Sequence, residues 1–108
     1  MANVYTNKKA SLTSSGATTL YTVPANSRAI LKSLLIAEDA SSTATIEVTL
    51  TNSSGTAFVV DKEVSLSSKA KEQVLSEPLI MEESEILKVN ATSGAADVIA
   101  SILEINRD

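Results

Sequence analysis

Acidic side chains are the most concentrated reactive groups in this sequence. Four glutamates lie close together, at Glu77, Glu82, Glu83 and Glu85. Paired carboxylates can catalyse glycoside hydrolysis, and clustered carboxylate oxygens can bind Ca²⁺. A glycosidase also needs aromatic platforms for its sugar, yet aromatic residues make up only 3% of the chain. The sequence also has no Asp-rich calcium-loop motif. We therefore expect a solvated acidic turn, with no catalytic pair and no metal site.

Other catalytic groups are missing from the sequence. The chain has no histidine, so it lacks the usual general base and the commonest catalytic metal ligand. No serine lies in a Gly-x-Ser-x-Gly elbow or has a histidine partner, which excludes a Ser–His–Asp triad. The three glycines are far apart and form no phosphate-binding loop. We expect a protein that is not an enzyme and takes no cofactor.

The composition predicts one small β-domain that matures without disulfides. A chain of 108 residues is the size of one domain, and the lack of cysteine suits a reducing cytosol. The net charge is −4 and the lysines form only short pairs, so we expect no direct contact with nucleic acid. Residues 1–9 are polar and predict no secretory leader. The aliphatic run at 34–37 is far shorter than the ~20 residues of a membrane span, so we expect no membrane partner.

Alternating side chains give the clearest structural signal. Ile46, Val48 and Leu50 alternate with polar residues, as in a strand with one buried face. A turn cluster follows at 52–55, and an apolar run returns over 57–64. These segments predict a β-hairpin.

The remaining apolar runs complete a pattern of seven or eight short strands. Turn residues separate them at the regular spacing of a sandwich, so the predicted fold is an all-β antiparallel β-sandwich, jelly-roll-like. For the segment around Pro78 we expect two short strands, and a short helix over 68–75 is the alternative. The other predicted strands are 18–23, 28–38, 73–75, 79–81, 86–91 and 97–105.

The last predicted strand is apolar on both faces. Val98, Ala100 and Ile102 face one side, and Ile99, Leu103 and Ile105 face the other. A strand of this kind is covered on both faces. The second cover is either a neighbouring subunit or the loops of the chain itself, and the sequence does not distinguish them.

The N-terminal segment, residues 1–15, is predicted to be an arm or an edge strand ahead of a single β-sandwich domain at 16–108. Its large apolar residues are few, which suits an arm laid across a partner, while a frayed terminus is the alternative. The candidate subunit or capsid interface residues are Val4, Tyr5, Leu12, Ile99, Leu103 and Ile105.

The order of these turns and strands resembles a group of small virion proteins of tailed bacteriophages, especially phages of aquatic bacteria. The resemblance covers residues 12–105 and departs at 67–73, which is more charged and lysine-rich than the turn expected there. It is carried by Leu20–Ser27, Ala29–Ala37, Ala44–Asp61, Pro78–Ile80, Ile86–Val89 and Leu103–Ile105.

The resemblance implies a β-sandwich that acts through assembly and has no active residues. Such proteins decorate or cement capsids, or occur in neck and tail parts. We therefore expect a capsid cement or decoration protein on the virion surface, assembled in the host cytoplasm. Its partners would be the major capsid protein or other virion proteins and its own copies. A trimer suits the threefold axes where decoration proteins sit.

Two other functions stay open on the sequence. One is a neck or tail ring or adaptor protein of the virion. The other is a glycan- or receptor-binding module, for which Tyr5 or Tyr21 would supply the aromatic surface.

Overall fold

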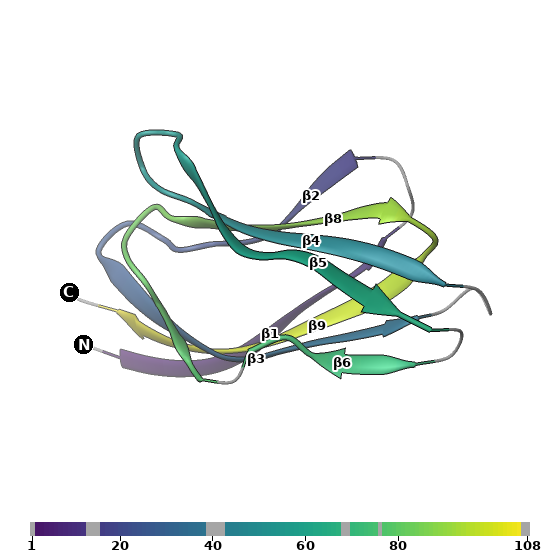
Figure 1. Cartoon of the computed structure of the whole chain (residues 1–108). Coiled ribbons are helices and arrows are strands. Elements are labelled where there is room, and N and C mark those ends of the chain that lie inside the picture. The colour runs from purple at the N-terminus through teal and green to yellow at the C-terminus, as the bar shows by residue number, and fades with distance from the viewer. Residues whose placement is uncertain (1, 13–15, 39–42, 68–69, 76, 107–108) are drawn as a thin grey trace.

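The computed structural model describes residues 2–12, 16–38, 43–67, 70–75 and 77–106. These residues form nine strands in two antiparallel sheets that pack face to face (Figure 1). The described part of the chain contains no helix long and apolar enough to cross a membrane. The strands are β1 (Ala2–Leu12), β2 (Gly16–Thr22), β3 (Ser27–Glu38), β4 (Ala44–Thr51), β5 (Ala57–Leu66), β6 (Lys71–Gln73), β7 (Leu79–Met81), β8 (Ile86–Ser93) and β9 (Ala96–Asn106).

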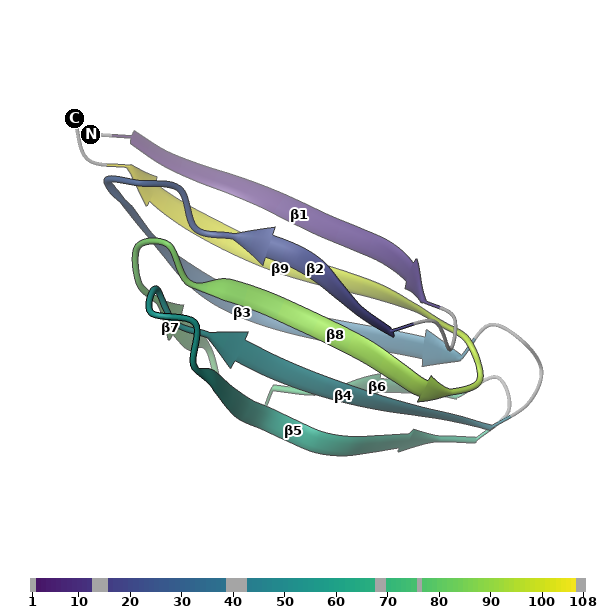
Figure 2. The same ribbon diagram turned by 90° about the horizontal axis from the view of Figure 1, so that it is seen from above.

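The strands are distributed between the two sheets as in a jelly roll. Sheet A has the order β1-β9-β3, and the short strands β6 and β7 both pair with β3 at its far edge. Sheet B has the order β2-β8-β4-β5. Only the β4–β5 and β6–β7 connections stay within one sheet, and the others pass between sheets (Figure 2). The predicted all-β antiparallel sandwich is confirmed.

The ninth strand is β1, the segment predicted to be an arm or an edge strand. It pairs with β9 from Ala2 opposite Asn106 to Leu12 opposite Ala96, without a register shift. This segment forms the edge strand of sheet A, and β9 becomes a central strand between β1 and β3.

The core lies between the sheets and follows from the alternation along each strand. Ile46 and Val48 of sheet B point inward, opposite inward residues of sheet A. Leu31 and Leu34 are both fully buried although they are three residues apart, because β3 bulges between Leu31 and Ser33. The bulge inserts one extra residue, Lys32, and turns it toward solvent.

Two turns rely on local chemistry. In the predicted β4–β5 hairpin, which is confirmed, Asn52 Oδ1 accepts hydrogen bonds from the backbone N–H of Ser54 at 3.1 Å and Thr56 at 2.9 Å. The β8–β9 connection crosses between the sheets at Gly94, where φ is +74°. A Cβ added to Gly94 would lie 2.9 Å from Ala44 Cα, so only glycine fits there.

The segment around Pro78 forms two short strands as predicted, with one correction. The first runs over Lys71–Gln73 rather than 73–75. Leu34 explains the shift, because its N–H donates to Gln73 Oε1 at 2.6 Å and its carbonyl accepts from Val74 N at 2.9 Å. Val74 and Leu75 then pack against the core instead of continuing the strand. The described residues of this segment form no helix.

A part-buried side-chain hydrogen bond joins the two sheets. Tyr21 of sheet B donates through Oη to Glu104 Oε2 of sheet A at 2.6 Å. Burial and the hydrogen bond to Glu104 raise the pKa of Tyr21 well above its usual value.

Candidate interaction surface

The acidic cluster forms a turn that is held by its own side chains. Glu83 Oε2 accepts from the backbone N–H of Asn26 at 2.6 Å, and Glu85 Oε1 accepts from that of Glu82 at 2.8 Å. These bonds order the corner where the chain enters β8. The residues that the structure describes contain no group of three or more carboxylate, histidine or cysteine side chains placed to hold a metal ion.

An extended apolar surface lies on the outer face of sheet A, which is the face turned away from sheet B. Residues directly opposite each other in neighbouring strands point to the same side of a sheet. Tyr5 lies opposite Leu103, Leu103 opposite Ile30, and Ile30 opposite Ile80. These four residues form an apolar row that crosses the sheet from β1 to β7. Tyr5 is 76% exposed and Ile80 is 65% exposed, while the two middle residues are half-buried.

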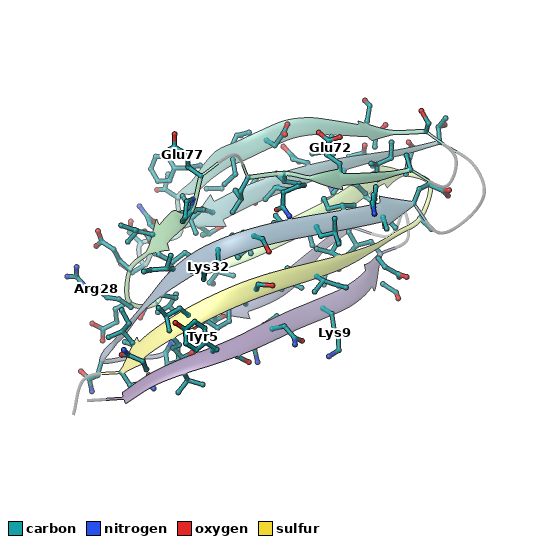
Figure 3. All side chains as sticks on the ribbon, turned by 90° about the horizontal axis from the view of Figure 1, so that it is seen from below. Tyr5, Lys9, Arg28, Lys32, Glu72 and Glu77 are labelled. Atoms are coloured by element: carbon teal, nitrogen blue, oxygen red, sulfur yellow. The ribbon has the colours of Figure 1, made fainter. Side chains whose placement is uncertain are left out.

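Further rows lie on either side of the apolar row. Ile99 lies opposite Leu35, and Ile105 lies opposite Arg28. A polar row runs between the Leu103 and Ile99 pairs, with Ser101 facing Ser33 on one side and Asn7 on the other. The face therefore alternates apolar rows with a polar row, and no described segment of the chain covers it (Figure 3).

Charged side chains of this face lie on several strands. Lys9 lies on β1, Arg28 and Lys32 lie on β3, and Lys71 lies on β6 opposite Ala37. Glu72 lies opposite the buried Ile36 and therefore points to the other side of the sheet. Lys9 Nζ donates to Asn7 Oδ1 at 3.1 Å, which holds the ammonium on the outer face. The basic side chains of this face are thus spread over β1, β3 and β6, and the acidic Asp97 lies among them on β9.

Two shallow hollows lie on the β1 side of the outer face of sheet A. One, of about 300 Å³, is lined by Tyr5, Asn7, Lys32 and Ser101 among others. The second, of about 390 Å³, lies near Ile99 and the β1 end of the sheet. Each presents a mixed polar and apolar surface at the junction of β1 and β9.

The structure brings most of the predicted interface residues together. Tyr5, Ile99, Leu103 and Ile105 share the outer face of sheet A. Leu12 is only 2% exposed and belongs to the core of this chain. The prediction that Leu12 is an interface residue is therefore corrected.

Val4 lies on the other side of β1. It is opposite Glu104, whose side chain points into the sandwich toward Tyr21. Val4 is nevertheless partly exposed, since it belongs to an edge strand.

Three apolar members of the face were not predicted from the sequence. Ile30 and Leu35 belong to β3, whose apolar residues on both sides already resembled the pattern of β9. The similar patterns of β3 and β9 therefore contain the signal that predicts Ile30 and Leu35 on this face. Ile80 lies in a strand of three residues, which is too short to show an alternation.

The sequence matches no protein-family model. It also matches no curated protein.

The fold is similar to that of a chain in the structure of infectious bursal disease virus Gx strain. The TM-score is 0.50 at 10% sequence identity, and the similarity covers 98% of this chain but 34% of that chain. This protein thus spans about a third of the length of the viral chain that it matches. At this identity the likeness shows the fold alone.

A second similarity is to the cryo-EM structure of giant freshwater prawn Macrobrachium rosenbergii extra small virus (XSV) VLP. It has a TM-score of 0.36 and 13% identity, and covers 100% of this chain and 82% of that chain. A TM-score this low carries no argument about the present protein.

Proposed function

We propose that this chain is a non-enzymatic structural protein of a virus particle, and that it is a capsid cement or decoration protein of a tailed bacteriophage. In this role it binds the major capsid protein or other virion proteins on the capsid surface. It is assembled in the host cytoplasm.

The observation that carries the proposal is the outer face of sheet A. Its apolar row has two strongly exposed ends, Tyr5 and Ile80, on a rigid sheet. Contiguous exposed apolar surface marks sites of protein association. The sequence resemblance to phage virion proteins supports the setting, and the fold similarity to a chain of a virus structure is consistent with it.

A cement protein works by adding contacts between capsid subunits that would otherwise separate. Any ligand that binds the assembled shell and not its separated subunits stabilises the shell by mass action. The sandwich suits this task because a rigid sheet loses little conformational freedom when it binds. A trimer is the arrangement that we propose at capsid threefold axes, where its symmetry matches that of the shell.

The test is cosedimentation of the purified protein with heads of the phage that encodes it. We expect saturable binding and a higher temperature of head disruption when the protein is bound. Absence of binding to heads at about 10 µM protein, which would mean an affinity weaker than about −7 kcal/mol, contradicts the proposal.

A neck or tail ring or adaptor is the alternative within the virion. A ring or adaptor protein could use the same fold and the same surface, so the position of the protein in the virion distinguishes the two roles. Gold-labelled antibody against the chain should decorate the whole head surface if the protein is a cement. Labelling confined to one vertex or to the tail would assign it to the ring.

A glycan- or receptor-binding module is favoured by one observation. Tyr5 is highly exposed beside the hollow that Asn7 and Lys32 line, which combines an aromatic surface with polar groups. Binding to a glycan array that is lost in Tyr5→Ala would support this role, and an array without a bound sugar would remove it.

A further inference from the structure

We propose that the outer face of sheet A binds a second copy of this chain, so that two sandwiches pair face to face about a twofold axis. The inference concerns how the protein associates with itself. It does not rest on the virion role, and it concerns the free protein, in which a second copy takes the place that the capsid protein takes on the particle.

The order of residues in the apolar row makes the face complementary to itself. Consider a twofold axis that lies in the interface, parallel to the strands, between β9 and β3. Rotation about it lays each row over the same row of the partner in reverse order. Tyr5 then covers Ile80 of the second copy, and Leu103 covers its Ile30. The two most exposed apolar side chains of the row cover each other, once at each end.

The neighbouring rows match in the same way. Ile99 lies opposite Leu35 within one chain, so the rotation places Ile99 over Leu35 of the second copy. In the polar row, Ser101 comes over Ser33 of the second copy, and hydroxyls face hydroxyls. In these rows apolar side chains therefore meet apolar ones and polar side chains meet polar ones, whereas at the end of the face Ile105 comes over Arg28 of the second copy.

The edges of the sheet meet through polar side chains. The rotation exchanges the two edges, so Lys9 comes over Gln73 of the second copy, because both lie in the row of Ile99 and Leu35. In the same way Ser11 comes over Lys71 of the second copy.

The face is large enough for such a pair. The molecule measures 46 × 26 × 21 Å, and the two longer extents span about 1,200 Å². A standard interface buries about 800 Å² on each partner, so two thirds of this face would suffice. Two sheets packed in this way keep their strands within about 30° of each other.

Lys32 opposes close packing. It lies at the β3 bulge near the centre of the face and lines the hollow beside Tyr5. Its ammonium must stay hydrated in the pair, because burying an unpaired charge is costly. We therefore expect Lys32→Leu to tighten the pair.

The experiment is sedimentation equilibrium of the full chain over a dilution series. Wild-type protein should reach twice the 11.3 kDa chain mass, and Ile80→Glu should raise the dissociation constant at least about tenfold. Val59→Glu is the matched control, since Val59 is an exposed apolar residue (56%) of sheet B and its substitution should leave the mass unchanged. Circular dichroism checks that each variant is folded, and Tyr5→Ser provides a second disruption of the same contact.

The outcomes separate this inference from the proposed trimer. A dimer, or a hexamer that Ile80→Glu splits into trimers, supports the twofold pair. A monomer at about 100 µM, which corresponds to an affinity weaker than about −5.5 kcal/mol, overturns it. A trimer that Ile80→Glu does not affect also overturns it, while leaving the capsid role intact.

Discussion

The hydrogen bond from Tyr21 to Glu104 should be a measurable part of the free energy of unfolding. It joins β2 of one sheet to β9 of the other, and Tyr21 is only 4% exposed. Tyr21→Phe removes the hydroxyl and keeps the ring in the core. Hydrogen bonds to charged groups contribute about 1.5–3 kcal/mol. Because Glu104 is only half-buried and can regain water, we expect a loss near the lower end of that range.

Urea denaturation at pH 7 measures this loss. Tyr5→Phe is the control, since Tyr5 is exposed and its substitution should change the free energy of unfolding by less than about 0.5 kcal/mol. In a Glu104→Gln background the acceptor is neutral, so Tyr21→Phe should cost only about 1 kcal/mol. A loss below about 0.5 kcal/mol in the Glu104 protein would refute the reasoning, as would an equal loss in both backgrounds.

Burial of Tyr21, together with the same bond, sets a pH dependence in the alkaline range. The pKa of Tyr21 is raised in the folded protein above the unfolded value of 10.0. Its contribution is therefore complete below pH 10 and is lost as pH rises toward the folded pKa, because the unfolded chain releases this proton first. Wild type should therefore lose more stability than Tyr21→Phe between pH 9 and pH 11.5. Parallel curves for the two proteins would contradict this assignment.

Three further predictions concern the core and the turns, each measured by urea denaturation. Leu31→Ala, at a fully buried position, should cost about 2–5 kcal/mol, and a cost below 1 kcal/mol would contradict its place in the core. Gly94→Ala should cost more than Gly55→Ala, because both have positive φ but only the added Cβ at Gly94 meets backbone atoms; equal costs would count against this geometry. Asn52→Ala should cost about 1 kcal/mol through the loss of its hydrogen bonds in the hairpin turn, and no change would show that the turn does not need them.

The sequence was sufficient where local chemistry decides the structure. Alternation at Ile46, Val48 and Leu50 and the turn at 52–55 specify the β4–β5 hairpin without knowledge of the rest of the chain. The apolar residues on both faces of the last strand predicted a cover on each face; sheet B covers one face of β9, and no described segment of the chain covers the other.

The sequence was insufficient where distant segments meet. Nothing in residues 2–12 shows that they pair with β9, since strand pairing depends on contacts across most of the chain. A single leucine among polar residues does not show which face it occupies, so Leu12 was placed on the surface although it lies in the core. The β3 bulge also changes the alternation at Lys32, and Ile80 joins the outer face only through its pairing with Ile30.

The most direct test of the central claim is photo-crosslinking in assembled virus particles from position 80. If the chain assembles through the outer face of sheet A, Ile80 lies in the interface, because it ends the apolar row. A photoreactive residue in place of Ile80 should crosslink to a second copy or to the capsid protein, whereas one in place of Val59 on sheet B should not. Crosslinks from position 59 alone, or none from position 80, would contradict the account.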